Sequence, residues 1–80
     1  MALYQFDIYS EKLELITSEV MGFEEKVHAR AKAGRFAKKH NGPVDVATYD
    51  PAKDFDERYI TTAYPSVHTR SGYYFERIEN

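Results

Sequence analysis

Apolar residues stand at every second position in two short stretches near the amino terminus. More polar residues separate Tyr4, Phe6 and Ile8, which is the pattern of a strand with one buried face. Leu13 and Leu15 resume the alternation after a short polar connection. Together the two stretches predict an N-terminal β-hairpin, although its turn lacks an Asn-Gly pair.

From Gly22 the period changes, and small or apolar residues recur every three or four positions. Glu24 and Glu25 suit the first turn of a helix, and Asn41-Gly42 is a typical stop. The pattern predicts a helix from about Phe23 to His40. Because its inner face is mostly small, we expect close approach to the sheet, with sheet aromatics filling the gaps. That face comprises Phe23, Val27, Ala31, Gly34 and Ala37.

Three further strands are expected after the helix. Residues 44–49 alternate and end at Asp50-Pro51, and residues 58–64 are β-branched and aromatic before Pro65. Residues 73–78 predict a fifth strand, with a bulge or a single helical turn as the open alternative. A polar loop fills 50–58, and a second loop fills 66–72. The expected fold is α+β: one helix packed on an antiparallel sheet of four to five strands, in the order ββαβββ.

Length and composition fit one small folded domain that spans residues 1–80. The chain is 42% hydrophobic and 30% charged, as ordinary globular proteins are. It has no cysteine, which excludes disulfides and thiolate chemistry. We find no signal-peptide pattern and no run of ~20 apolar residues, so we expect a cytoplasmic protein without membrane contact.

Charge is segregated along the chain, although the net charge is only −2. Residues 1–25 carry six acids against Lys12, whereas residues 26–44 carry six bases and no acid. Residues 45–57 are acidic again, with five acids against Lys53. Blocks of opposite sign predict surface patches of opposite potential, which steer charged partners.

Acidic residues and tyrosines are the first candidates for partner contact. One acidic patch would arise from Asp7, Glu11 and Glu14, and another from the 45–57 segment. If the sheet is antiparallel, the loop after residue 49 can come near the hairpin. Exposed tyrosines are preferred anchors at protein interfaces. The expected partner-binding residues are Asp50, Asp54, Asp56, Glu57, Tyr64, Tyr73 and Tyr74.

The expected helix carries a basic face that invites a nucleic-acid interpretation. A solvated helix also needs charged residues on its outer face, and the acidic total argues against a nucleic-acid binder. Direct nucleic-acid binding is therefore the less favoured hypothesis. This face comprises His28, Lys32, Arg35 and Lys39.

One constellation has residues suited to catalysis. His68 and Arg70 lie in the loop before Tyr73, and together they provide an acid/base group and a phosphate clamp. Residues 72–78 resemble the last strand of small microbial ribonucleases, but Gly72 stands where their catalytic histidine is expected. The simpler interpretation is a polar turn. No spacing of histidines or acids predicts a metal site, and no motif predicts a cofactor.

Two function hypotheses result. The first is a non-enzymatic interaction domain that binds a larger protein, one that handles nucleic acid, and blocks its nucleic-acid groove through acidic patches and tyrosines. In size and layout the chain resembles phage-encoded inhibitors such as anti-CRISPR proteins, although fold analogy carries little functional weight. The alternative is a toxin-type ribonuclease that uses His68 and Arg70. The sequence sets neither the partner nor the oligomeric state.

Overall fold

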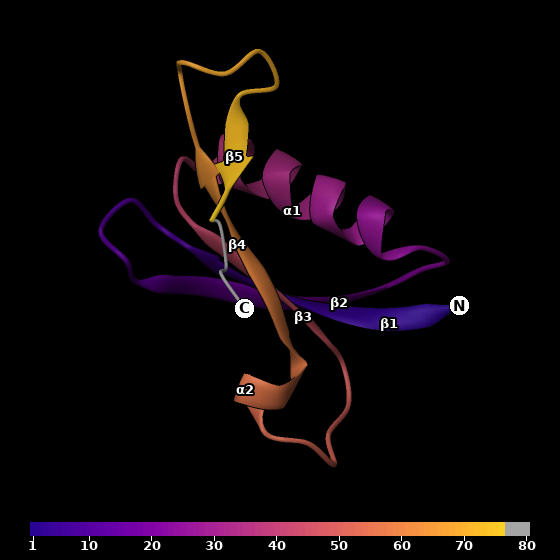
Figure 1. The fold of residues 1–80 in the computed structure, drawn as a ribbon. Helices are drawn as coiled ribbons and strands as arrows, with labels where there is room; N and C mark the ends of the chain where they lie inside the picture. Colours follow the sequence, from indigo (N-terminus) through magenta and orange to yellow (C-terminus); the bar gives the residue numbers. More distant parts are fainter. Residues whose placement is uncertain (77–80) are drawn as a thin grey trace.

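The computed structural model describes residues 1–76, which form a five-stranded antiparallel sheet with one long helix on one face (Figure 1). This confirms the expected α+β class, with a short helix added before the fourth strand. The elements are β1 (Ala2–Tyr9), β2 (Leu15–Phe23), α1 (Lys26–His40), β3 (Val44–Thr48), α2 (Phe55–Arg58), β4 (Tyr59–Pro65) and β5 (Tyr73–Phe75).

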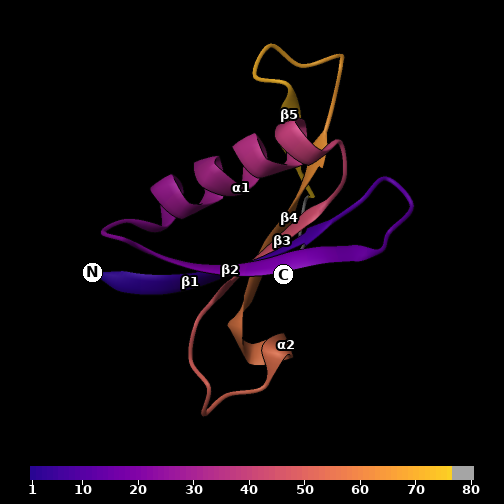
Figure 2. The same cartoon turned by 180° about the vertical axis from the view of Figure 1, so that it is seen from behind.

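The strand order is β2-β1-β3-β4-β5, so β1 is paired on both sides and β2 and β5 are the edges. Every neighbouring pair is antiparallel. Helix α1 lies over one face of the sheet, while α2 lies at the end of the molecule away from α1 (Figures 1 and 2). Within residues 1–76, no helix of the length of α1 covers the second face of the sheet.

The junction between hairpin and helix differs from expectation. Strand β2 runs on to Phe23, because Gly22 pairs with Leu3 and Phe23 pairs with Ala2 in the hairpin register. The ring of Phe23 then packs edge-on against Phe6, with 6.1 Å between centroids. The predicted helix start at Phe23 was therefore wrong, since cross-strand pairing outweighs the helical spacing.

Helix α1 begins at Lys26, after Glu25 as the N-terminal cap, so the acids do not lie in its first turn as predicted. Its buried face is also shifted. Val27 is 58% exposed, and Ala31 is only half-buried. The prediction failed there because it counted the face from Phe23, which belongs to the sheet. The residues of α1 that are buried are Ala29, Ala33, Gly34 and Ala37.

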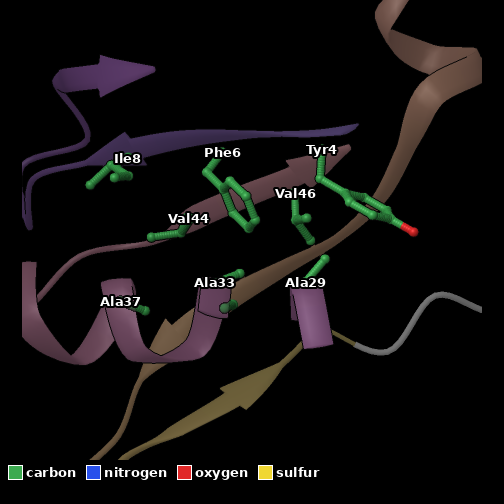
Figure 3. Close-up of a cluster of buried hydrophobic side chains, with 9 residues drawn as sticks. Tyr4, Phe6, Ile8, Ala29, Ala33, Ala37, Val44 and Val46 are labelled. Atoms are coloured by element: carbon green, nitrogen blue, oxygen red, sulfur yellow. The ribbon is translucent and has the colours of Figure 1, made fainter. Parts of the chain in front are cut away.

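The core lies between α1 and the middle of the sheet (Figure 3). Ala29, Ala33 and Ala37 stand four residues apart, so they form one stripe that faces Phe6 on β1 and Val46 on β3. Small residues on the helix thus pack against larger ones on the sheet. Burial of each large side chain stabilises the fold by roughly 1.5–3 kcal/mol.

Strand β5 brings an aromatic ring under the helix. The ring of Tyr73 lies against Gly34, where any side chain would overlap it. This confirms the expectation that sheet aromatics fill the space beside the small helix face. The observed strand is shorter than the predicted strand 73–78, because β5 ends at Phe75. Ile78 lies outside the described residues.

Candidate functional site

The sheet face that points away from α1 is the candidate site, and we call it the open face. Along β1, Tyr4, Phe6 and Ile8 are buried towards α1, so the alternate residues point the other way. Antiparallel partners share a face, so the register extends this set across the sheet. The open face contains Gln5, Asp7, Tyr9, Val20, Asp45, Tyr59, Thr62, Tyr64 and Tyr74.

Two carboxylates lie directly opposite each other on the open face. Asp7 of β1 and Asp45 of β3 are register partners. Like charges in this position destabilise a sheet. Burial, together with the charges of Asp7 and Glu76, raises the pKa of the Asp45 carboxyl, against a lowering by its hydrogen bond from Thr62. The fold therefore tolerates a costly pair of half-buried acids at the centre of the open face.

Hydrogen bonds hold both carboxylates in place. Asp7 accepts from Ser18 on β2 at 2.7 Å and from Gln5 at 3.0 Å. The Thr62 hydroxyl donates to Asp45 at 2.6 Å. The Thr62 hydroxyl also lies within hydrogen-bond distance of the Tyr59 hydroxyl, which itself donates to Glu76 at 3.2 Å. These partners hold the acids in place without neutralising them.

A small pocket of about 310 Å³ opens on the same face beside Asp45. Tyr9 of β1 and Tyr64 of β4 both line it, together with Leu13 and Pro43. Burial, followed by nearby acids, raises the pKa of both phenols. They are therefore neutral rings beside an acid at neutral pH.

Tyr64 continues into an aromatic pair. Its ring stacks on that of Tyr74 from β5, with 5.3 Å between centroids and 22° between planes. Tyr74 remains 49% exposed. Of the three tyrosines expected at an interface, Tyr64 and Tyr74 thus lie together on the open face, whereas Tyr73 lies beneath α1.

The expected acidic loop flanks the sheet at one end. Asp54, Asp56 and Glu57 are exposed around α2, while Asp50 is half-buried and accepts a turn bond from the Ala52 amide. The Arg58 guanidinium ties this loop to the open face through the Gln5 side chain and the Thr48 carbonyl, each at 3.0 Å. The loop acids therefore adjoin the open face.

The loop approaches the hairpin at its open end, as expected, whereas the hairpin turn lies at the other end of the sheet. The Tyr49 amide donates to Leu3 at the start of β1, while the turn with Glu11 contacts Asn41 beyond the far end of α1. Antiparallel pairing of β1 with β3 requires this separation. Asp7 and Asp45 lie between these two ends, in the middle of the sheet.

The basic residues of α1 lie on the opposite side of the molecule from the open face. His28, Arg35 and Lys39 are exposed, and the ammonium of Lys32 lies 4.8 Å from the centre of the Phe36 ring. They form a solvated outer surface of the helix, which leaves the nucleic-acid interpretation without further support.

The histidine loop borders an open cleft of about 780 Å³. His68 and Arg70 line it together with Lys38 from α1. The third member of the predicted constellation, Tyr73, packs its ring against Gly34 instead. The structure thus brings together cations in this cleft but not the full predicted set.

Asp45, Thr62, Tyr59 and Tyr9 were not singled out from the sequence as site residues. The sequence feature that could have identified them is their place at the outward positions of the predicted strands, where exposed side chains are expected. It was insufficient, because only the strand order shows that Asp7 and Asp45 meet.

Comparison with known proteins gives no match: no family model, curated protein or solved structure is significantly similar to the chain. In residues 1–76, no three histidines or acids gather in a metal-binding geometry. None of the helices in that part of the chain is long and apolar enough to cross a bilayer.

Proposed function

We propose that this protein is a non-enzymatic interaction domain whose open face occupies a basic, nucleic-acid-binding groove on a larger protein. The observation that carries the proposal is the direct pairing of Asp7 with Asp45 on the sheet face that, within residues 1–76, no long helix covers. Such a pair lowers stability, so its presence favours a role in binding a cationic partner.

Charge complementarity supports this choice of partner. Grooves that bind nucleic acid present lysine and arginine to phosphates. The open face presents Asp7 and Asp45 at its centre, and the exposed Asp54, Asp56 and Glu57 lie at its end. Such a row of carboxylates competes with a phosphate backbone for the same cations.

The tyrosines supply the apolar part of the contact. Tyr64 and Tyr74 form a stacked pair beside the acids, and stacked rings lose little freedom when they bind. Together, the charges provide steering and the rings provide burial. An inhibitor of the phage-encoded kind, similar to anti-CRISPR proteins in size and layout, is the most specific form of this proposal.

The test is capture of partners from a cell lysate on the immobilised protein, followed by mass spectrometry and competition. We expect captured proteins that bind nucleic acid, and we expect added DNA or RNA to release them. As matched probes, D7N/D45N should reduce capture, while R35Q/K39Q removes as many charges from the opposite side and should not. If added DNA or RNA does not release the captured proteins, the proposal is refuted.

The cleft at His68 supports one alternative, a toxin-type ribonuclease. Its lining combines His68, Arg70 and Lys38, which suits phosphate binding and proton transfer. The test is RNA cleavage by the purified protein in the presence of a metal chelator. Cleavage that H68A abolishes would establish this alternative in place of the interaction domain.

A further inference from the structure

We infer that the pocket between Tyr9, Asp45 and Tyr64 is a binding site for a single arginine side chain of the partner. The inference rests on the proposed function and identifies which group of the partner the open face holds. It follows from the placement of two rings and one carboxylate across three adjacent strands.

The strand order sets the spacing of the rings. Tyr9 lies on β1 and Tyr64 on β4, with β3 between them. The Tyr9 amide donates to the Pro43 carbonyl at 3.0 Å, so Pro43 is next to Tyr9 just before β3. Two strand spacings separate the tyrosine backbones by roughly 10 Å. A planar group in contact with a ring on each side needs about 7–8 Å between the rings, so the backbone spacing leaves room for one such group.

The carboxylate lies on the middle strand, one step along the sheet from the row of Tyr9, Pro43 and Tyr64. Asp45 is two residues beyond Pro43 on the same face of the sheet, and it also lines the pocket. Thr62 holds its Oδ1 atom at 2.6 Å, which fixes the orientation of the group. Oxygens of a carboxylate accept more than one hydrogen bond each, so Asp45 can still receive donors from a ligand.

Charge and shape select arginine among possible occupants. The charges of Asp7 and Glu76 raise the pKa of the Asp45 carboxyl, so acids beside the pocket favour a cation there. A guanidinium is planar, stacks on aromatic rings and donates to a carboxylate through two parallel bonds. A lysine ammonium is compact, more strongly hydrated and unable to stack. The volume of about 310 Å³ suits one side chain.

The experiment is a titration of the isotope-labelled full-length protein with an end-blocked Gly-Arg-Gly peptide, observed by NMR. We expect saturable shifts at Tyr9, Asp45 and Tyr64. The same peptide with citrulline keeps the shape but replaces the guanidinium by a neutral urea, and it should bind about tenfold more weakly or worse. A Gly-Lys-Gly peptide should also bind more weakly.

Two variants separate the pocket from general charge attraction. D45N should weaken arginine binding about tenfold, whereas D54N, which removes the same charge from the exposed loop, should leave it unchanged. Y64L should also weaken it, because the ring is lost. The NMR spectrum of each variant shows directly whether it is folded.

Equal binding of the citrulline or lysine peptide, or equal weakening by D45N and D54N, would overturn the arginine site. The outcome is separable from that of the proposed function because no partner protein is needed. Arginine binding in the pocket without capture of nucleic-acid-binding proteins would uphold the site and reject the larger proposal. Capture of nucleic-acid-binding proteins, without arginine binding in the pocket, would do the reverse.

Discussion

At the scale of single residues, the contact between Gly34 and Tyr73 sets how closely α1 can lie to the sheet. A Cβ atom at position 34 would overlap the Tyr73 ring. Glycine in a helix interior costs about 1 kcal/mol relative to alanine. Glycine at this position offsets that cost, because the absence of a side chain leaves space for the Tyr73 ring under the helix.

We predict that Gly34→Leu destabilises the protein by roughly 1–3 kcal/mol, because the larger side chain overpacks this contact. Urea denaturation measures the change. Arg35→Leu, at the exposed neighbouring position, is the control and should have little effect. Adding Tyr73→Ala to the leucine variant should recover part of the loss. An unchanged urea midpoint in Gly34→Leu would show that the contact is not tight.

Asp45 gives a prediction about pH. Folding raises the pKa of its carboxyl above 3.8, chiefly through burial, so the folded state holds the proton more tightly than the unfolded chain. Its contribution to stability therefore falls as pH rises through the folded pKa. Thr62, Asp7, Glu76, Tyr9 and Tyr64 are the groups that surround it.

Asp45→Asn removes this titration and keeps an oxygen that accepts from Thr62. The variant should be more stable than the wild type at pH 7, and the difference should shrink as the pH falls towards about 3.8 and below. Urea denaturation at pH 7 and pH 3 measures both values. Asp54→Asn, in the exposed loop, is the control and should show a smaller change. A difference that grows in acid would contradict the prediction.

At the scale of elements, α1 begins without a side-chain cap. Glu25 has the extended backbone of a cap residue, with φ −128° and ψ 144°, but its side chain makes no capping hydrogen bond. Its carbonyl already accepts from the His28 amide. The extra methylene of glutamate, compared with aspartate, takes its carboxylate out of the geometry that good caps use.

Glu25→Asp should therefore stabilise the protein by about 0.5–2 kcal/mol, since it adds a cap and keeps the charge near the positive end of the helix. Thermal unfolding would show this as a higher midpoint. Glu24→Asp makes the same chemical change one residue before the cap and should have little effect. Equal effects of the two variants would mean that capping is not responsible.

The acidic loop depends on Arg58, which joins α2 to β1 and β3. Its guanidinium donates to the Gln5 side chain, the Thr48 carbonyl and the Lys53 carbonyl. We predict that Arg58→Met costs about 1–3 kcal/mol and speeds hydrogen exchange of amides in residues 50–57. Arg70→Met, in the exposed loop, is the control. Unchanged exchange would show that the loop is held by other contacts.

At the scale of the whole molecule, the two sides of the sheet carry opposite charge. The outer surface of α1 is basic, whereas the open face and the α2 loop are acidic. A net charge of −2 conceals this polarity. Such an arrangement orients the molecule as it approaches a charged partner, and it weakens as salt screens the field over about 8–10 Å.

Replacement of Asp50, Asp54, Asp56 and Glu57 with serine should therefore weaken the partner complex and lower its association rate, most strongly at low salt. His68→Ala should leave the complex intact. Surface plasmon resonance at several salt concentrations measures the rates. Loss of activity confined to His68→Ala and Arg70→Ala would favour the ribonuclease. Loss confined to Arg35→Glu and Lys39→Glu would make the basic helix the contact surface.

Local features of the fold could be predicted from the sequence. Asn41 takes the left-handed conformation, with φ 52°, that ends α1, and β3 and β4 occupy the expected positions to within one residue at each end. These features follow from side-chain period and backbone preference, which act between near neighbours. The start of α1 was missed because pairing of Phe23 with Ala2 is a contact between separate strands.

The candidate site depended on the tertiary structure. The sequence assigned Asp7 to one acidic patch and Asp45 to another, and the strand order made them direct partners. The tertiary structure also places Tyr9 and Tyr64 on one face of the sheet, whereas the ring of Tyr73 packs against Gly34 on the other face. Periodicity tells which residues share a face of one strand. Which strands become neighbours depends on how all of them bury their apolar faces against α1 together, and this long-range balance is not contained in any local pattern.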